Sequence, residues 1–183
     1  MAPVFGPREP GEAALALSFL ELAELIVVAR FRRGSGKQIP LARLRAAHDF
    51  ARKKLGIEYP FVSGKLKVEG GHIMHEFEQE NPGPGKLALD RNGHYALPID
   101  FHDAMEMFEF DTESGLASRW YPLGREVPVV VDPDHGAGWP TIKGRNVRLE
   151  VLHARWKAGW DIEEIAEDFD LDPGDVQAAL RAA

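Results

Sequence analysis

The pattern of apolar and polar positions predicts a first helix from about residue 14 to residue 33. Leucine, isoleucine, valine and phenylalanine cover most of its circumference, and Ser18, Glu21 and Glu24 form a thin polar stripe. A helix that is apolar over most of its surface must be covered on several sides. We therefore predict that a second copy of the chain supplies part of that cover. The residues expected at this homodimer interface are Leu20, Ile26, Val27, Val28 and Phe31.

A second helix is predicted over residues 39–56, where leucines recur on one face and Gly56 provides a C-cap. The runs KLKV and HIMHEF follow it, and the tripeptide EGG at residues 69–71 separates them. This pattern favours a β-hairpin, in which Lys65 and Lys67 share one face of the first strand. Two helices followed by such a hairpin are typical of part of a winged-helix module.

The middle of the chain predicts short strands. QENPGPGK is expected to be a loop, and LALDRNGHYALPI carries an Asn-Gly pair between apolar runs, which is a strong hairpin signal. FHDAMEMFEF predicts a short acidic helix, and LASRWYPL and VPVVV predict further strands.

The last 36 residues predict three helices. The first has two leucines and Trp156 on one face, and the second begins with a capping box of Asp161 and Glu164. The third has Asp172 as its N-cap and Pro173 in its first turn. The last two helices have helix-turn-helix spacing, but carboxylates at the start of the third disfavour contact with DNA phosphates. We interpret this unit as a protein-contact module.

Together these elements predict an α+β fold in three segments. Residues 1–78 are expected to be a basic, dimerising part with helices and a winged-helix-like arrangement. Residues 79–126 form a β-hairpin-rich linker region, and residues 127–183 contain the C-terminal three-helix unit.

The composition is that of an ordinary globular protein, with 44% apolar and 28% charged residues. The chain has no cysteine, which excludes disulfides and thiolate chemistry. Its N-terminus lacks the basic start and apolar segment of a secretory signal. The apolar run over residues 15–31 contains three charged residues, so it predicts a buried helix and not a membrane span. We expect a cytoplasmic protein.

The net charge of −7 is distributed unevenly along the chain. Residues 1–67 hold 12 Lys and Arg against 6 Asp and Glu, whereas residues 68–183 hold 10 against 23. Such asymmetry indicates a basic part that faces an anion, although charge can also serve only to keep each part soluble. If the basic part binds DNA, the expected contacts are Arg43, Arg45, Arg52, Lys53, Lys54, Lys65 and Lys67.

The stretch VVVDPDHGAGWPTIKGRNV has the strand, glycine loop and helix layout of a phosphate-binding site, but it lacks the motif. Lys143 precedes Gly144, no Ser or Thr follows, and Pro140 removes a backbone donor. His72 and His75 are predicted on opposite faces of a strand, which disfavours a metal site. No nucleophile motif is found either. We predict a protein that is not an enzyme and holds no cofactor or metal.

Residues 129–181 nevertheless carry a specific set of motifs, by which they resemble a small bacterial domain found in VapB-type antitoxins. The matching motifs are Asp132-Pro133, Gly138-Trp139-Pro140, Ile142-Lys143-Gly144, Ala158-Gly159, Ile162 to Ala166, Asp168-Phe169, Leu171-Asp172 and Val176 to Arg181. The segment from LSFLELAELIVV to GIEYPF is more loosely similar to the part that follows the first helices of a MerR-like module in the same group. Longer members begin with a helix-turn-helix that has no counterpart here before Leu17.

This resemblance implies an antitoxin-like component of a type II toxin-antitoxin system. Its basic part would bind operator DNA as a dimer for autoregulation, and its acidic part would neutralise a cognate PIN-domain RNase toxin. An acidic surface suits that role because it can cover a site built to bind RNA. Two alternatives stay open, namely a stand-alone DNA-binding transcriptional regulator and a dimeric adaptor that binds only protein.

Overall fold

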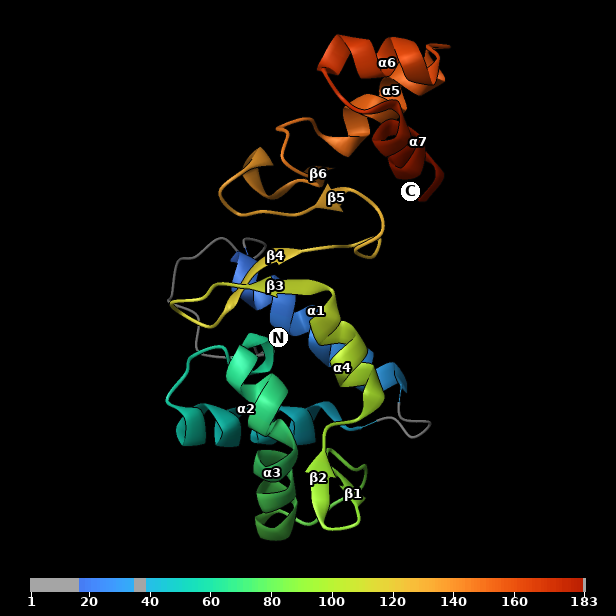
Figure 1. Cartoon of the computed structure of the whole chain (residues 1–183). Coiled ribbons are helices and arrows are strands. Elements are labelled where there is room, and N and C mark those ends of the chain that lie inside the picture. Colours follow the sequence, from blue (N-terminus) through green and yellow to red (C-terminus); the bar gives the residue numbers. More distant parts are fainter. Residues whose placement is uncertain (1–16, 35–38, 183) are drawn as a thin grey trace. The chain divides into compact units, whose positions relative to one another are not determined.

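The computed structural model of the chain describes residues 17–34 and 39–182 (Figure 1). The chain divides into two compact units. Unit one consists of residues 1–106 and 110–117, and unit two of residues 107–109 and 118–183. The predicted middle segment, 79–126, is therefore shared between the two units. The mixture of helices with small antiparallel strand pairs agrees with the predicted α+β class.

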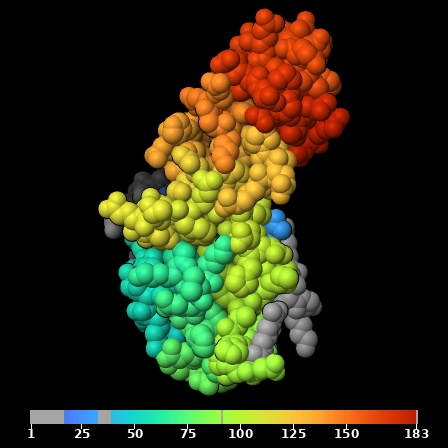
Figure 2. All heavy atoms as spheres, in the orientation of Figure 1, coloured from blue at the N-terminus to red at the C-terminus, as the bar shows by residue number. Residues whose placement is uncertain are grey.

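Unit one is mostly helical. In the space-filling view the atoms of its second helix, third helix and hairpin, cyan to yellow-green, gather into one continuous body (Figure 2). Its elements are α1 (Phe19–Gly34), α2 (Leu41–Leu55), the short 3-10 helix η1 (Pro60–Val62), α3 (Gly64–Glu80), β1 (Leu89–Arg91), β2 (His94–Ala96) and α4 (Ile99–Glu106).

The apolar surface of α1 is covered largely by unit one itself. α1 packs along α4 and against η1, and Figure 1 shows α4 beside it. Val27, Val28 and Phe31 are buried, and the Phe31 ring centroid lies 5.0 Å from that of Phe101 on α4. Because one chain already buries these side chains, the breadth of the apolar surface does not by itself require a second copy.

The polar stripe of α1 also contributes to the interior of unit one. Glu24 is only 1% exposed, and its carboxylate lies 2.9 Å from Nε2 of His48 on α2. It also accepts a hydrogen bond of 3.1 Å from the Phe61 N–H of η1. Burial raises the pKa of Glu24, and the hydrogen bond and charge of His48 offset only part of that rise. The carboxylate thus joins three elements of unit one.

The segment predicted as a β-hairpin at residues 65–77 lies instead within the helix α3, so that prediction is wrong. Ser63 caps the helix by accepting a hydrogen bond of 3.2 Å from the Leu66 N–H. Gly70 and Gly71, which indicated a turn, lie inside the helix, and β2 and Leu97 pack against them. A Cβ at Gly71 would lie 2.0 Å from the Tyr95 carbonyl oxygen. These glycines therefore permit a close approach and do not mark a turn, and the expected wing strands are absent from this described segment.

The Asn-Gly hairpin is confirmed. β1 pairs with β2 in antiparallel register, with Leu89 opposite Ala96. Asn92 and Gly93 both have positive φ, 55° and 83°, as the tight two-residue hairpin turn requires. The Asp90 side chain accepts a hydrogen bond of 2.8 Å from the Gly93 N–H and closes the turn.

Unit two contains short strands followed by three helices. The strand β3 (Phe108–Phe110) pairs with β4 (Ala117–Trp120), and the chain passes between the two units within this pair. The remaining elements are β5 (Val129–Val130), the 3-10 turn η2 (Gly136–Gly138), β6 (Thr141–Ile142), α5 (Leu149–Lys157), α6 (Ile162–Phe169) and α7 (Pro173–Ala182).

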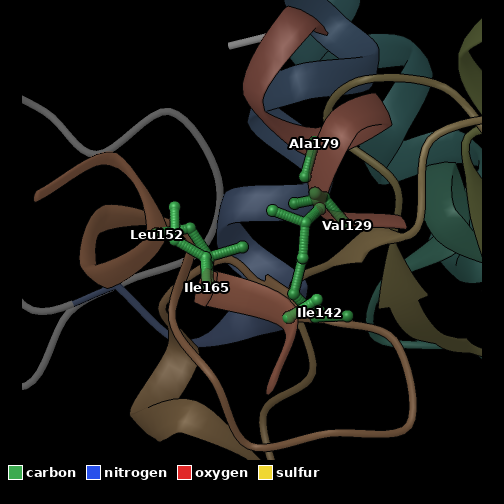
Figure 3. Close-up of a cluster of buried hydrophobic side chains, with 7 residues drawn as sticks. Val129, Ile142, Leu152, Ile165 and Ala179 are labelled. Atoms are coloured by element: carbon green, nitrogen blue, oxygen red, sulfur yellow. The ribbon is translucent and has the colours of Figure 1, made fainter. Parts of the chain in front are cut away.

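The core of unit two joins the β5–β6 pair to the three helices. Val129 lies opposite Ile142 in the antiparallel pair, and both are buried. Figure 3 shows their side chains close to those of Leu152 on α5, Ile165 on α6 and Ala179 on α7. The two short strands thereby anchor the helical unit, and the atoms of residues 149–182, red in Figure 2, form one group.

The three predicted C-terminal helices are confirmed. Asp161 accepts a hydrogen bond of 2.8 Å from the Glu164 N–H, and the Glu164 carboxylate accepts one of 2.9 Å from the Asp161 N–H. This is the predicted capping box, which satisfies two backbone donors at the start of α6. Within the described ranges, no helix has the length and apolar character that crossing a membrane requires.

Candidate functional site

The outer surface of the three-helix unit is acidic. Residues 149–183 hold nine Asp and Glu against three Lys and Arg. α6 turns Ile165 and Ala166 into the core, so Glu163, Glu164 and Glu167 are left exposed on its outer side. Unit two therefore presents a negative helical surface that attracts cations and repels phosphate groups.

A pocket of about 450 Å³, which we name the acidic pocket, lies on this surface. The guanidinium of Arg155 lies 4.6 Å from the Trp160 ring centroid and 3.5 Å from the Asp168 carboxylate. An aromatic ring and a carboxylate thus already hold one guanidinium here, and groups of this kind suit basic side chains of another protein. The residues that line the acidic pocket are Ala158, Gly159, Trp160, Glu164, Glu167 and Asp168.

Trp156 was predicted to share one face of α5 with two leucines, but it is not buried there. Its side chain is 48% exposed, whereas Trp160, on the loop after α5, packs against the core cluster. Periodicity along α5 placed Trp156 near the leucines, but the aromatic residue beyond the helix end occupies the inner position. An exposed tryptophan on an acidic unit is a suitable anchor for a protein partner.

A second group of charges joins the strands of unit two. Asp132 is 5% exposed, accepts a hydrogen bond of 2.7 Å from Arg119 Nε and lies 3.2 Å from His135 Nδ1. Burial alone would raise the pKa of Asp132, but the hydrogen bonds from Arg119, the Asp134 N–H and His135 lower it overall. The Asp132 carboxylate is therefore a fixed negative charge in unit two.

Glu109 forms the other half of this charge network. The Tyr121 hydroxyl donates a hydrogen bond to Glu109, and a guanidinium nitrogen of Arg119 donates another at 3.3 Å. Lys143 Nζ lies 3.7 Å from the same carboxylate. The bond from Tyr121, with those cations, holds the pKa of Glu109 below its usual range despite partial burial. No local motif predicted this network, because its members come from separate strands and loops.

Arg43, the first of the predicted DNA-binding residues, is instead held inside unit one. Its side chain is 10% exposed and donates hydrogen bonds to the Asn81 carbonyl at 2.7 Å and to the Gly85 carbonyl at 3.2 Å. The guanidinium also lies 5.2 Å over the Phe77 ring. Arg43 therefore fastens the end of α3 and the following loop to α2.

Two more of the predicted cations form ion pairs in unit one. Lys54 pairs with Glu76 on α3, and Lys67 lies 2.5 Å from Glu106 on α4. Because α3 is a helix, residues two apart point about 200° apart, so Lys65 and Lys67 do not share a face. Of the other predicted residues, Arg45 is half-buried, and the exposed ones are Arg52, Lys53 and Lys65.

The residues predicted at a dimer interface fall into two groups. Val27, Val28 and Phe31 are buried within unit one, whereas Leu20 and Ile26 are half-buried. Association through α1 stays a prediction, and Leu20 and Ile26 are the predicted interface residues that unit one leaves partly exposed. The amino-terminal end of the predicted first helix, residues 14–16, lies outside the described residues.

His72 and His75 lie on α3 and not on opposite faces of a strand. The His75 ring stacks on Tyr95 with centroids 3.5 Å apart, and the His72 ring meets the same tyrosine edge-on at 5.7 Å. Gln79 lies 3.0 Å from His75 Nε2. Over residues 17–34 and 39–182, no group of three or more His, Cys, Asp or Glu is arranged to hold a metal ion.

Comparison with known protein families gives a match to unit two. Residues 129–182 match the family described as "Protein of unknown function (DUF433)". The matched segment begins at the strand β5 and ends in α7, so it contains the whole buried cluster of unit two.

A sequence match and a structure match from Mycobacterium tuberculosis each cover nearly the whole chain. The protein named "Putative antitoxin VapB45" (strain ATCC 25618 / H37Rv) is 26% identical over 184 residues, which cover 96% of this chain and 74% of that protein. The crystal structure of Rv2018 superposes with a TM-score of 0.79 at 26% identity, covering 97% of this chain and 84% of the other. These findings support an antitoxin-like family, as the motifs implied, but they contain nothing on a MerR-like winged helix.

Proposed function

We propose that this chain is an antitoxin that neutralises a basic toxin through the acidic three-helix surface of unit two. The observation that carries the proposal is the acidic pocket, in which Trp160 and carboxylates line one concavity. A relative over most of the chain is named as an antitoxin, and this favours a non-enzymatic, regulatory protein with a toxin partner.

The chemistry of the toxin follows from the charge of this surface and from the motif resemblance. An RNase of the PIN-domain kind must hold RNA phosphates, so its substrate groove is expected to be lined with Lys and Arg. An acidic surface can bind beside or over such a groove, and its charges speed the encounter and exclude acidic partners. Glu167 and Asp168 supply the negative charge, and exposed Trp156 supplies an apolar anchor.

The test uses a PIN-domain RNase encoded beside the gene for this chain. Glu167→Lys places a positive charge in the acidic pocket, so we expect the Kd for the toxin to rise by about tenfold or more. Binding is measured by titration calorimetry, and inhibition by cleavage of a labelled RNA. Glu126→Lys is the matched control, because Glu126 is an exposed carboxylate of the same unit that lies outside the three helices and does not line the pocket.

The proposal fails if Glu167→Lys binds and inhibits the toxin as tightly as the wild type does, or if the control weakens binding as much as Glu167→Lys. It also fails if the adjacent nuclease never binds the purified chain. Thermal unfolding of each variant confirms that α6 stays folded, and Glu164 is left unchanged because it belongs to the capping box.

A second candidate function is binding of operator DNA by unit one. The observation that favours it is the exposure of Arg52 and Lys53 on α2 and of Lys65 on α3. Phosphate contacts make binding salt-dependent, so each cation removed is expected to reduce the salt slope by about one. A promoter fragment is titrated at several salt concentrations with Lys53→Ala and Lys65→Ala. Arg43→Ala is expected to act on folding, because Arg43 fastens α2 to the end of α3.

A further inference from the structure

Unit two carries another exposed tryptophan, in a basic setting. Trp139 is 52% exposed, and the guanidinium of Arg148 lies 5.7 Å over its ring. Residues 135–148 contain Lys143, Arg145 and Arg148 and no carboxylate. An aromatic ring among cations is the usual arrangement at surfaces that bind unpaired nucleic acid, where a base stacks on the ring and phosphates meet the cations.

The turn that ends at the tryptophan follows His135, which lines a pocket of about 500 Å³ that we name the basic pocket. The backbone N–H of Trp139 donates a hydrogen bond of 3.1 Å to the Gly136 carbonyl. A Cβ at Gly136 would lie 3.8 Å from the Asn146 side-chain oxygen, so Asn146 lies beside this turn. The residues that line the basic pocket are Arg119, Asp132, His135, Lys143, Gly144, Arg145 and Asn146.

The three cations of residues 135–148 can exchange their ion-pair partners. The side chains of Lys143, Arg145 and Arg148 are 55%, 52% and 41% exposed, and their ion pairs have distances of 3.7, 3.2 and 3.4 Å. Ion pairs at such exposed positions contribute little to stability, so an incoming phosphate can replace the carboxylate. Arg119 differs, because Asp132 and Glu109 hold it in place, and it forms a fixed part of the pocket wall.

We propose that this surface of unit two binds single-stranded nucleic acid, with a base on Trp139 and adjacent phosphates at Lys143 and Arg145. A single strand is favoured over a duplex because a base can stack on the indole only when its own face is free. The proposal goes beyond toxin binding and uses residues outside the acidic pocket. The failure of either proposal therefore leaves the other intact.

The experiment measures binding of fluorescein-labelled oligo(dT) and oligo(U) of about ten nucleotides by anisotropy. Two phosphate contacts on a single strand predict a plot of log K against log salt with a slope of about −1.4. The double variant Lys143→Ala/Arg145→Ala is expected to reduce that slope to near zero. Trp139→Leu is expected to weaken binding about tenfold or more and to remove the quenching of tryptophan fluorescence.

Matched controls come from the same unit. Trp156→Leu removes a similarly exposed tryptophan, and Lys157→Ala removes an exposed cation, both from α5 outside the basic pocket. Neither is expected to change affinity or slope. The proposal is overturned if neither oligonucleotide binds at about 50 mM salt, if a duplex of equal length binds as tightly, or if the controls weaken binding as much as the pocket variants do. Arg145→Lys keeps the charge and is expected to retain the slope, which separates loss of a contact from misfolding.

Discussion

Glu109 links the stability of unit two to pH at the scale of one side chain. The hydrogen bond from Tyr121, together with Arg119 and Lys143, lowers the pKa of Glu109 below its ordinary value of 4.5. The unfolded chain then binds this proton more readily than the native chain does. The free energy of unfolding therefore falls as the pH drops below about 4.5 and through the pKa of the folded state. We expect Glu109→Gln to flatten this fall, although Asp132 contributes a similar dependence.

Tryptophan fluorescence can follow this effect in unit two alone, because all four tryptophans, at positions 120, 139, 156 and 160, belong to it. Urea unfolding is measured at neutral pH and at steps below pH 4.5 for wild type, Glu109→Gln and the control Glu126→Gln. Glu126 is an exposed carboxylate of the same unit. A loss of stability in acid that is the same for Glu109→Gln as for the wild type would contradict the prediction.

At the scale of the element, replacing Gly71 in α3 by alanine is expected to destabilise the protein, although the same change stabilises most helices. Replacing glycine by alanine inside a helix ordinarily stabilises it by about 1 kcal/mol. At Gly71, however, the added Cβ would lie 2.0 Å from the backbone oxygen of Tyr95. We expect Gly71→Ala to destabilise unit one by about 1–3 kcal/mol, because the hairpin must move away from the helix. Unfolding followed by far-ultraviolet circular dichroism measures the change.

The control for this prediction is Gly64→Ala, at the first residue of the same helix. A Cβ there meets only the Gly115 carbonyl, at an ordinary contact distance of 3.6 Å. We expect Gly64→Ala to be near neutral or slightly stabilising. If Gly71→Ala stabilises the chain as much as Gly64→Ala does, the close approach of the hairpin to α3 is not a feature of the folded protein.

The elements that the sequence predicted correctly are those whose signals are local. The capping box at Asp161 begins α6, and the Asn-Gly pair specifies the β1–β2 turn, and both signals lie within a few residues. The α3 prediction failed because the meaning of Gly70 and Gly71 depends on a hairpin much later in the chain. The acidic surface was predictable from composition, but the acidic pocket was not, since it depends on how Trp160, beyond the end of α5, packs against the core.

At the scale of the whole molecule, charge summed over halves of the sequence was too coarse a guide to binding surfaces. The basic half contains Arg43, which is held inside unit one, and Lys54 and Lys67, which form ion pairs with carboxylates of the same unit. The acidic half contains both the acidic surface of α6 and the basic pocket. Unit two alone thus presents two surfaces of opposite charge. A binding function has to be assigned to side chains that the fold leaves exposed, and not to a stretch of sequence.

Association of two chains through α1 is a further prediction at this scale. Ile26 is half-buried, whereas Val28 is 4% exposed and packs inside unit one. If the remaining apolar surface of α1 forms a dimer, Ile26→Glu should yield a folded monomer, because it places a charge in the interface and leaves the core intact. Val28→Glu should instead unfold unit one, since an unpaired buried charge costs several kcal/mol. Light scattering gives the mass and circular dichroism the helicity. A wild-type chain that is monomeric at micromolar concentration, or an Ile26→Glu variant that keeps the wild-type mass, would contradict a dimer through α1.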